Sequence, residues 1–493
     1  MGSSRSLGEL GEVVEGDVIG DPETDIHDVT HDSREAGPGT LFVAIVGQTH
    51  DGHDYIDQAL SAGASAVCVE RPGNRGIPEL VVRDTRAALG QLAAEVHGHP
   101  SRSLAVVGVT GTNGKTTVTH YVEALLNGAG VRTGLIGTIA SRVGDELLPS
   151  VRTTPEASDF QRMLAQMRQS GAESVAVEVS SHALALNRID ATRFAVAAFT
   201  NLSQDHLDFH GSMTAYREAK ERLFSEFDVG TAVLNIDDPV GSAIAGWFEG
   251  DVVTVGAGGH FAAEEIEPVP GGTGFTLRAP GGTYEVIAPV FGSFNVSNLA
   301  VAIACASLVG PSVRDLVPLL EDLRAVPGRF EIVSQEDEPL VVVDYAHTPD
   351  GIRLAVATGR EFASGRVIVV FGAGGDRDSA KRPLMGRAAS GADRVFVTSD
   401  NPRSEDPDAI IDQVTSGITA DHAREADRRK AINSAIAEAG PGDVVLILGK
   451  GHESGQERAG ETVPFDDREV ARTALDVLRK SANFGTNSGS IET

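Results

Sequence analysis

The chain has 493 residues, of which 41 are lysine or arginine and 70 are aspartate or glutamate, so its net charge is −29. At roughly 150 residues per domain this length predicts about three domains, and a hydrophobic content of 41% excludes an intrinsically disordered chain. The acidic balance and an aromatic content of only 5% argue against nucleic acid or an anionic membrane as partner, because both attract basic surfaces.

The amino-terminal sequence indicates a cytoplasmic protein. The start, MGSSRSLGELGEVVEG, lacks the apolar stretch of a secretory signal. No run of about 18 apolar residues could span a membrane. Cys68 and Cys305 lie far apart in apolar stretches, so we expect two buried thiols, without a disulfide or a zinc site.

Apolar segments that end in glycine or polar residues, each followed by helix-like sequence, predict an α/β fold with parallel sheets. They lie at 41–47, 103–111, 174–181, 340–347, 366–375 and 443–451. Ligands of such sheets bind at the carboxyl ends of the strands, and the polar motifs of this chain lie at those ends. Between 270 and 290, alternating residues on either side of Pro280-Gly281-Gly282 predict an antiparallel hairpin.

Two changes in composition predict domain boundaries, at HGHPSRS (97–103) and at AVPGRFE (325–331). We therefore expect a smaller N-terminal α/β domain over 1–101, a central domain over 102–328 and a C-terminal domain over 329–480. The small polar residues of 481–493 predict a disordered tail.

A phosphate-binding loop follows the apolar segment at 103–111. In TGTNGKTT, Gly111 and Gly114 let backbone N–H groups surround phosphate oxygens, Lys115 can reach the β and γ phosphates, and Thr116 can bind Mg²⁺. The strict motif has glycine where this chain has Val109, so the loop is a variant. Switches, motors, kinases and ligases all carry such loops. The sequence has no NKxD motif of a guanine-nucleotide switch, so the interpretation of the chain as a non-enzyme is less favoured.

Three further positions leave alternatives open. Glu178 ends an apolar segment and is either a Mg²⁺ ligand or a solvated loop acid. His206, Asp208 and His210 are spaced like metal ligands, but they could equally belong to a polar loop that caps the next helix. Lys220, in YREAKERLF, is by itself typical of a solvated lysine on a helix surface.

The motifs GTNGKTT, EVSSHAL, NLSQDHLDFHG, YREAKERLF, FGSFNVSN, VPGRFE, DYAHTPD, GAGGDRDSAKRP, SDNPRSED and GKGHE follow one another in the order of one family. On them the chain resembles the Mur ligases, from DSREAGPGTLFVA near the start to FDDRE near the end. The resemblance implies an N-terminal UDP-sugar-binding domain, a central P-loop ATPase with a mostly parallel sheet, and a Rossmann-like C-terminal domain that brings an amino acid. It also implies that a carboxylate of UDP-N-acetylmuramoyl-L-alanyl-D-glutamate attacks ATP to give an acyl phosphate, which an amine then converts to an amide.

The resemblance implies roles for single residues. Those implied to be catalytic are Lys115, His206 and Lys220. ATP is implied to bind Gly111, Thr112, Asn113, Gly114, Lys115, Thr116, Thr117, Asn295, Asn298, Arg329, Asp344 and His347. The implied Mg²⁺ ligands are Thr116, Glu178, His206 and Lys220, with Lys220 carbamylated by CO₂. The UDP-sugar is implied to bind Ser33, Gln48, Thr49, His50, Thr153, Thr154, Ser180 and Arg188.

Two of these residues also suit a local structural role. Thr154-Pro155-Glu156 is a good helix start, with Thr154 as N-cap. Asn295 could equally cap a helix. At one further position the chain differs from some related ligases: it has Leu186 where they carry a glutamine near the sugar-peptide.

The segment SDNPRSED indicates which amino acid is added. By resemblance, DNPR marks the enzymes that add meso-diaminopimelate, and those that add L-lysine carry a different sequence. The second carboxylate of diaminopimelate suits paired hydrogen bonds from Arg403. The implied binding set is Arg377, Asp400, Asn401, Pro402, Arg403, Gly449 and Glu453. The alternatives are L-lysine as the added amino acid, a folylpolyglutamate synthetase-like ligase, and a nucleotide-dependent switch or scaffold. We expect the diaminopimelate-adding ligase to be a monomer.

Overall fold

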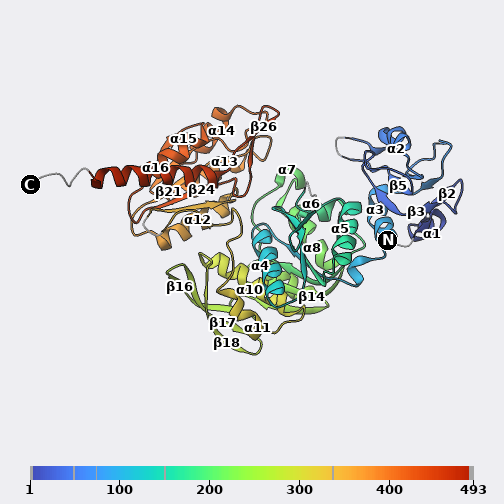
Figure 1. Ribbon diagram of the computed structural model, residues 1–493, viewed down its shortest axis with the longest axis horizontal. Coiled ribbons are helices and arrows are strands. Elements are labelled where there is room, and N and C mark those ends of the chain that lie inside the picture. Colours follow the sequence, from blue (N-terminus) through green and yellow to red (C-terminus); the bar gives the residue numbers. More distant parts are fainter. Residues whose placement is uncertain (1–3, 48–49, 74, 149–151, 336–337, 488–493) are drawn as a thin grey trace, which may run out of the picture. The chain divides into compact units, whose positions relative to one another are not determined.

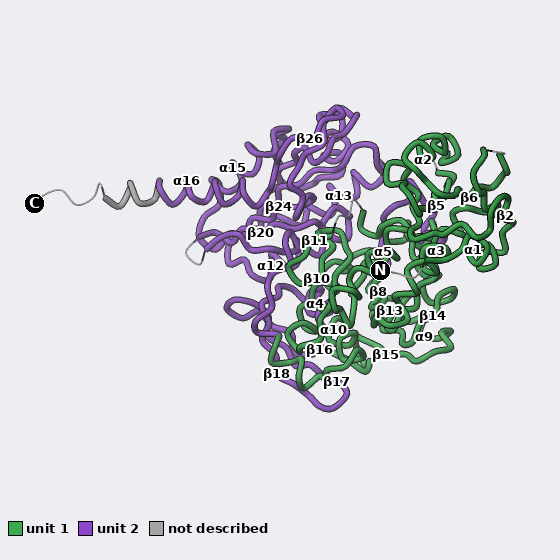
Figure 2. The backbone as a smooth tube through the Cα atoms, turned by 45° about the vertical axis from the view of Figure 1, so that its right-hand side comes forward, with its two compact units in different colours: residues 1–201, 217–262, 300–319 green, residues 202–216, 263–299, 320–493 purple. Residues whose placement is uncertain are grey.

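The computed structural model describes residues 4–47, 50–73, 75–148, 152–335 and 338–487 (Figure 1). These residues form two compact units, which Figure 2 shows in different colours. The first comprises 1–201, 217–262 and 300–319, and the second comprises 202–216, 263–299 and 320–493. The domain boundaries expected near 101 and 328 stay predictions. Among the described residues, no helix has both the length and the apolar character needed to cross a bilayer.

The first unit begins with a five-stranded sheet in the order β2-β7-β6-β5-β4. Its strands are β2 (Asp17–Ile19), β4 (Asp28–Thr30), β5 (Thr40–Val43), β6 (Ala66–Val69) and β7 (Glu79–Val81), and only β2 is antiparallel to its neighbour. Alternate residues of β5 point to opposite faces, so Leu41 and Val43 pack in one core and Phe42 packs in another. The helices of this part are α1 (Leu7–Val13), α2 (Ile56–Ala62) and α3 (Thr85–Val96). A separate pair, β1 (Arg5–Ser6) with β3 (Asp25–Ile26), lies beside α1.

An eight-stranded sheet follows, in the order β11-β10-β9-β12-β8-β13-β14-β15. The strands from β9 to β15 in this order are parallel, and β10 and β11 are antiparallel to their neighbours. Their bounds are β8 (Ala105–Thr110), β9 (Thr133–Ile136), β10 (Ser141–Val143), β11 (Glu146–Leu148), β12 (Ser174–Glu178), β13 (Arg193–Phe199), β14 (Asp228–Asn235) and β15 (Asp251–Val255). The accompanying helices are α4 (Lys115–Gly128), α5 (Ala157–Gln169), α6 (Ser181–Ala185), α7 (Leu207–His210), α8 (Met213–Ser225) and α9 (Pro239–Trp247). β8 is central, so the loop that follows it lies in the middle of the carboxyl edge.

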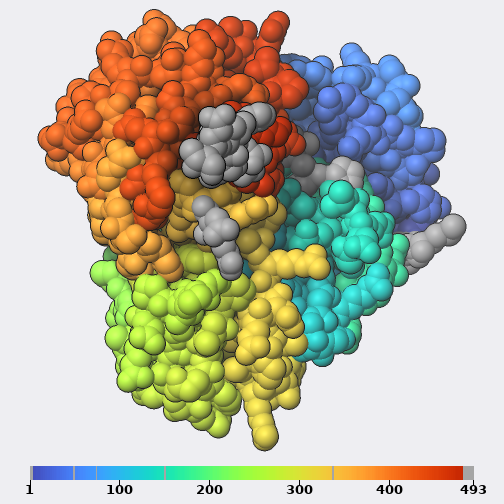
Figure 3. Space-filling view, turned by 60° about the vertical axis from the view of Figure 1, so that its left-hand side comes forward, coloured from blue at the N-terminus to red at the C-terminus, as the bar shows by residue number. Residues whose placement is uncertain are grey.

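The hairpin expected between 270 and 290 is confirmed. β17 (Gly272–Ala279) and β18 (Gly282–Ala288) pair antiparallel, with Ala279 opposite Gly282, and β16 (Ala262–Val269) completes a three-stranded sheet. In the space-filling view these strands form a continuous yellow-green part of the surface (Figure 3). Gly281 has a φ of +98°, a value that an L side chain rarely adopts, which explains glycine in the turn.

The C-terminal sheet is doubly wound, as a Rossmann-like domain requires. Its order is β19-β20-β24-β21-β22-β23, and only β19 is antiparallel. The strands are β19 (Glu331–Ile332), β20 (Leu340–Asp344), β21 (Val367–Phe371), β22 (Arg394–Val397), β23 (Asp421–Arg424) and β24 (Val444–Leu448). One face packs on α12 (Pro349–Phe362), α13 (Lys381–Ala389) and α14 (Pro407–Thr415), and the other packs on α15 (Arg428–Glu438) and α16 (Asp467–Asn487). The strand order changes direction between β21 and β24, and ligands bind at the carboxyl side of such a point.

The remaining elements are short, apart from α10 (Ser293–Ser307). They are α11 (Val313–Leu316), the 3₁₀ turns at Gly52–Tyr55, Pro100–Arg102 and Val317–Leu320, and the paired strands β25 (Gly455–Arg458) and β26 (Glu461–Pro464). Both cysteines are buried and free, as expected, and burial raises the pKa of each thiol. The α/β fold class is confirmed, and each apolar segment named in the sequence contains a strand.

One expectation is corrected at the C-terminus. The helix α16 extends to Asn487, so 481–487 are helical where we expected a disordered tail. Val470, Ala471 and Leu475 anchor α16 in the core, and a helix that has formed extends at little cost per residue. Residues 488–493 lie outside the described part of the chain.

A buried ion pair joins the first residues of α15 and α16. Arg428 Nε and Nη2 donate to the two carboxylate oxygens of Asp467 at 2.7 Å each, and both side chains are 0% exposed. Arg428 Nη2 also donates to Leu448 O at 2.9 Å, at the end of β24. The pair therefore fixes the edge of the sheet at which β24 ends.

We expect Arg428→Met to lower the free energy of unfolding by about 3–5 kcal/mol, because it leaves the Asp467 carboxylate buried without its partner. The measurement is denaturant unfolding followed by circular dichroism. The control is Arg353→Met, which breaks the exposed pair with Asp350 and is expected to cost at most about 1 kcal/mol. Equal losses in the two variants would contradict the prediction.

Candidate active site

The loop after β8 has the backbone of a phosphate-binding loop. Gly111 and Gly114 have φ values of +147° and +89°, and α4 begins directly after Gly114. A Cβ atom at position 111 would lie 1.9 Å from Thr200 Oγ1, so only glycine lets the chain pass this side chain. The first N–H groups of α4 lack partners within the helix and carry its positive dipole end, so the loop is suited to phosphate.

Thr200 and Asn201, which follow β13 and to which the sequence assigned no role, hold this loop. Asn201 accepts from Thr112 N at its backbone oxygen (2.8 Å) and from Asn113 N at Oδ1 (2.9 Å). Thr200 Oγ1 donates to Asn113 O at 2.6 Å. Asn201 opens the motif NLSQDHLDFHG and Thr200 directly precedes it, but the sequence pointed to His206, Asp208 and His210 in this segment. These hydrogen bonds hold the backbone of the loop to the segment that follows β13.

Two lysines converge on one carbonyl of the loop. Lys115 Nζ donates to Gly111 O and Thr112 O at 2.9 Å each. Lys220 Nζ donates to Gly111 O at 2.7 Å, and this side chain is buried. The interpretation of Lys220 as a solvated surface residue is therefore wrong, because α8 turns this position toward the loop.

Glu178 is also buried, at 0% exposure, so a solvated loop acid is excluded. Thr116 Oγ1 donates to Glu178 Oε2 at 2.9 Å. Thr138 donates to Glu178 through its backbone N–H at 2.8 Å and its hydroxyl at 3.0 Å. A Cβ atom at Gly137 would lie 2.4 Å from Glu178 Oε1, which explains glycine there. A hydroxyl and a carboxylate side by side are the oxygen ligands that Mg²⁺ prefers, so Thr116 and Glu178 fit this ion.

The described residues hold no cluster of three or more histidine, cysteine, aspartate and glutamate side chains that could bind a metal unaided. A magnesium ion would therefore depend on hydroxyl and phosphate oxygens as well. Asp208 is exposed, in the first turn of the short helix α7, and His210 packs against the ring of Tyr216 with centroids 5.1 Å apart.

In the second unit, His206 belongs to a charge cluster around Asp205. The Asp205 carboxylate is buried and lies 3.4 Å from His206 Nε2, 3.5 Å from His347 Nε2 and 3.4 Å from Lys381 Nζ. Burial opposes ionisation of Asp205, but the hydrogen bond from His347 and the nearby positive charges hold its pKa well below its usual range. Asp205 and Lys381 were missed, although both stand inside motifs that we had singled out.

The residues expected around the nucleoside lie near the end of β20 and in α10. Asp344 accepts from Phe330 N at 2.7 Å and Ala346 N at 2.8 Å; burial raises the pKa of its carboxyl, against the charge of Arg329. The Arg329 guanidinium lies 4.4 Å from the ring centroid of Tyr345, and His347 Nδ1 lies 2.8 Å from Tyr345 O.

Asn295 and Asn298 are buried in α10, where Asn295 Nδ2 donates to Phe291 O at 3.0 Å. Because α10 begins at Ser293, Asn295 is not the helix N-cap.

Part of the expected UDP-sugar set gathers beyond the end of β12. Thr154 Oγ1 donates to Glu178 O at 2.7 Å and accepts from Ser180 N at 3.2 Å. Thr153 Oγ1 lies 3.0 Å from Thr138 Oγ1. Thr154 is therefore not a helix N-cap: α5 is preceded by Glu156, and its cap carries no side-chain hydrogen bond. Ser180 caps α6 instead.

The other expected UDP-sugar residues lie in the N-terminal part of the chain. Ser33 Oγ donates to Gln58 Oε1 at 3.0 Å. The ring of His50 packs edge-on against Tyr55, with centroids 6.4 Å apart. Gln48 and Thr49 lie outside the described residues.

Arg188 belongs to a group of arginines around the buried carboxylate of Glu156. Glu156 oxygens lie 3.0 Å from Arg188 Nε, 2.8 Å from Arg152 Nη1 and 3.3 Å from Arg86 Nη1. Burial and the repulsion from Arg152 and Arg86 lower the pKa of Arg188, against the attraction of Glu156. Arg86 Nη1 also lies 3.4 Å from the carbonyl oxygen of Leu186. Three cations around one anion leave an excess of positive charge that suits an anionic ligand.

The residues expected to bind the amino acid lie past the ends of β21, β22 and β24. Asn401 Nδ2 donates to Glu453 Oε2 at 2.9 Å. Gly449 has a φ of +115°, and a Cβ atom there would lie 2.5 Å from Asp400 Oδ2. Burial raises the pKa of Asp400, against the charges of Arg428 and Lys450. A Cβ atom at Gly375 would lie 1.9 Å from Pro402 O, so the loops after β21 and β22 touch.

Arg403 is held in a strained backbone, with a φ of +53°. Its Nε donates to Glu457 Oε2 at 2.8 Å and its Nη1 donates to Gly375 O at 2.7 Å. Among the described residues, Nη2 of Arg403 has no hydrogen-bond partner, so part of the guanidinium can still meet a carboxylate. Arg377, in the loop after β21, is exposed.

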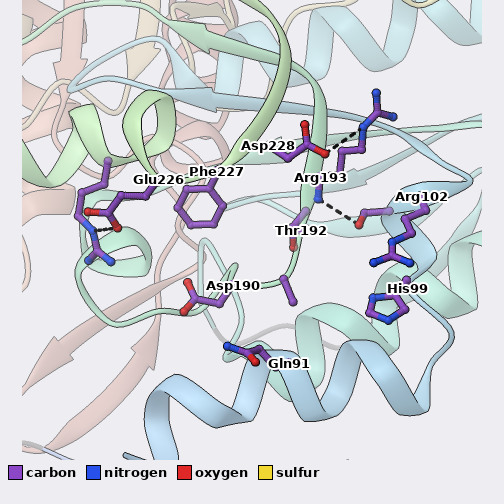
Figure 4. A pocket seen from close by; sticks show the side chains of 12 residues that line it. Gln91, His99, Arg102, Asp190, Thr192, Arg193, Glu226, Phe227 and Asp228 are labelled. Carbon is purple, nitrogen blue, oxygen red and sulfur yellow. Dashed lines mark hydrogen bonds and ion pairs between the residues drawn. The ribbon is translucent and has the colours of Figure 1, made fainter. Parts of the chain in front are cut away.

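A pocket in the first unit contains none of the predicted site residues (Figure 4). It has a volume of about 460 Å³ and is lined by Gln91, His99, Arg102, Asp190, Thr192, Arg193, Arg222, Glu226, Phe227 and Asp228, among others. Arg193 and Asp228 are the first residues of β13 and β14, so the pocket lies at the edge of the sheet opposite the phosphate-binding loop.

Asp190 in this pocket predicts a pH dependence of stability, because burial raises its pKa from 3.8 to about 6. The folded protein then holds a proton that the unfolded chain releases between these values, so stability falls as pH rises through this window. We expect Asp190→Asn to stabilise the protein by about 1 kcal/mol near pH 7.5, allowing for partial exposure, and to lose this advantage near pH 4.5.

The measurement is urea unfolding of both proteins across this pH range. The control is Asp228→Asn, whose side chain is 71% exposed, and we expect no comparable trend for it. The prediction would be contradicted if the free energies of unfolding of Asp190→Asn and of the unsubstituted protein differed by the same amount at all pH values.

The fold and this site define a P-loop nucleotide-binding α/β protein with a separate doubly wound domain. Comparison with known proteins is more specific. Residues 25–97 match the Mur ligase family catalytic domain, 109–306 the Mur ligase middle domain, and 328–451 the Mur ligase glutamate ligase domain. The chain therefore belongs to the Mur ligase family, whose members are ATP-dependent amide ligases.

Two relatives are both named UDP-N-acetylmuramoyl-L-alanyl-D-glutamate–2,6-diaminopimelate ligase. The protein from Geobacillus thermodenitrificans is 45% identical over 92% of this chain and 96% of its own. The protein from Streptomyces coelicolor is 44% identical over 96% of this chain and 97% of its own. A solved structure of a ligase of the same name is 33% identical, with a TM-score of 0.71, over 97% of this chain and 100% of that one.

Proposed function

We propose that this enzyme adds meso-diaminopimelate to UDP-N-acetylmuramoyl-L-alanyl-D-glutamate at the expense of ATP, in peptidoglycan synthesis. The observation that carries the substrate choice is the pairing of Asn401 with Glu453, together with Arg403 at the same sheet edge. An amide and an acid suit an ammonium group, and a guanidinium suits a carboxylate. Each end of diaminopimelate carries both an ammonium group and a carboxylate.

In this proposal the phosphate-binding loop aligns ATP for attack by the D-glutamyl carboxylate, which gives an acyl phosphate and ADP. The amine of diaminopimelate then displaces phosphate to form the amide. Two anions must meet in the first step, so cations have to offset their repulsion. Lys115 supplies one at the loop, and the amides at the start of α4 hold the phosphate oxygens in a fixed frame.

Thr116 and Glu178 fit a bound Mg²⁺ as oxygen ligands. The resemblance to the family adds His206 as a further ligand. Such an ion would neutralise charge on the phosphates. Lys220 is proposed to be carbamylated by CO₂, which would turn its buried ammonium into an anion close to the loop. Thr138 and Gly137 keep the Glu178 carboxylate in place for this role.

The UDP-sugar peptide is proposed to bind Ser33, Gln48, Thr49 and His50 in the N-terminal part and Thr153, Thr154, Ser180 and Arg188 in the central part. Its diphosphate and carboxylates are anionic, and the arginines around Glu156 supply local positive charge. The net charge of −29 therefore does not exclude anionic small molecules. We further propose that the enzyme acts as a monomer in the cytoplasm, where a reducing environment suits its two free thiols.

Phosphate release tests this function and its alternatives in one assay. The protein is mixed with ATP, Mg²⁺ and UDP-N-acetylmuramoyl-L-Ala-D-Glu, and meso-diaminopimelate, L-lysine or glutamate is added. We expect release with meso-diaminopimelate. Release with lysine alone would overturn the specificity, release with glutamate alone would favour the folylpolyglutamate synthetase-like alternative, and no release with any amine would overturn the ligase proposal.

A further inference from the structure

A buried lysine lies among the residues proposed to bind the amino acid. Lys450 follows Gly449 at the end of β24, and its side chain is 0% exposed. Its Nζ donates to Asn401 Oδ1 at 3.0 Å and to Glu453 Oε2 at 2.8 Å. A lysine is almost never fully buried unless it is paired, and here both partners belong to the proposed binding set.

The contacts of Lys450 fix the amide of Asn401. Asn401 Oδ1 accepts from Lys450 Nζ and also from Glu457 N at 3.0 Å. Its Nδ2 donates to Glu453 Oε2 at 2.9 Å. With two donors on the oxygen and an acceptor on the nitrogen, the amide has one favourable orientation, and Nδ2 retains a second N–H.

Lys450 also keeps Glu453 charged. Burial by itself would raise the pKa of Glu453, but the charge and hydrogen bond of Lys450 and the bond from Asn401 lower it. Both hydrogen bonds end on Oε2. Within the described residues Glu453 Oε1 accepts none, so this oxygen stays available to a cation.

We propose that Lys450 is a positioning residue for amino-acid recognition: it orients Asn401 and Glu453 so that Glu453 Oε1 and the second N–H of Asn401 meet the incoming amino acid. Lys450 itself makes no contact with that substrate in this arrangement. The inference rests on the proposed function and deepens it, because it explains why a positive charge is buried in a pocket for ammonium groups. The lysine neutralises one oxygen of Glu453 and leaves the other to the substrate.

The test is Lys450→Met in the full-length enzyme, with KM measured for meso-diaminopimelate, ATP and the UDP-linked dipeptide. We expect KM for meso-diaminopimelate to rise about 10–100-fold, the range seen when groups that orient metal-binding side chains are removed. KM for the other two substrates should change less than about twofold. The control is Lys430→Met on α15, whose side chain is 70% exposed, and it should leave all three values unchanged.

A double-mutant cycle distinguishes positioning from a merely structural role. If Lys450 acts through Glu453, then Lys450→Met should add little to the effect of Glu453→Gln on KM for meso-diaminopimelate. The inference would be overturned if the two substitutions raised KM for meso-diaminopimelate by factors that simply multiply in the double variant. It would also be overturned if Lys450→Met raised all three KM values equally. If Lys450→Met does not fold, Lys450→Gln replaces it and must meet the same criteria. Failure here while the original enzyme uses meso-diaminopimelate leaves the proposed function intact.

Discussion

Replacement of Lys220 by alanine is expected to lower kcat of the ligation by at least about 10²–10³-fold, the loss typical for removal of one preorganised electrostatic group. Lys220 is buried and donates to Gly111 O of the phosphate-binding loop at 2.7 Å. A lysine with this placement acts on the loop or on the phosphates that the loop binds. The measurement is steady-state phosphate release with all three substrates saturating.

Two further measurements separate the possible roles of Lys220. If the side chain works as an anionic carbamate, short carboxylic acids added to Lys220→Ala should restore part of the activity. If it only supports the loop, KM for ATP should rise and carboxylic acids should have no effect. The matched control is Lys430→Ala, an exposed lysine on α15. Full activity of Lys220→Ala would remove the residue from the mechanism.

The second large effect is expected at Arg403. Arg403→Lys should lower kcat/KM for meso-diaminopimelate by about 10²–10³-fold, because truncating one partner of a hydrogen-bonded charge pair costs about 2–5 kcal/mol. Lysine keeps the charge but cannot offer two parallel N–H groups to one carboxylate. It also cannot reproduce the bonds to Glu457 and Gly375 O that hold the guanidinium.

The specificity of this effect is checked with L-lysine as a competing substrate. L-Lysine lacks the second carboxylate, so the small rate with it should change less than a few-fold, and the preference for meso-diaminopimelate should collapse. Arg458→Lys, an exposed neighbour on β25, is the control. Equal losses for both amino acids would show that Arg403 supports the loop and does not select the substrate.

The strands were predictable because the information is local. A run of apolar residues with turn residues at its ends is enough to place β8, β12 or β24, and burial on both faces follows from the absence of polar residues in the run. The hairpin at 270–290 was predictable for the same reason. The loop after β8 also carries its whole signal in a few neighbouring residues.

The partners of the site residues were not predictable in this way. Lys220 has the local sequence of a surface lysine, and only the packing of α8 brings it to Gly111. The arginines around Glu156 come from segments up to about 100 residues apart, so no local pattern joins them. Asp205 directly precedes His206, and its own local sequence does not show that its carboxylate is buried among positive charges. Contacts of this kind depend on the tertiary structure. Predicting them requires either the structure itself or a resemblance to a known family.

In the C-terminal sheet the buried core and the loops proposed to bind the amino acid are separate parts of the chain, and this separation has an evolutionary consequence. The buried apolar residues of β21, β22 and β24 end at Phe371, Val397 and Leu448, and the residues proposed to choose the amino acid begin only after them. Loops that follow a completed core can be exchanged without repacking it. A ligase built in this way can change its amino acid through a few substitutions in two or three loops while its folding stability stays nearly constant.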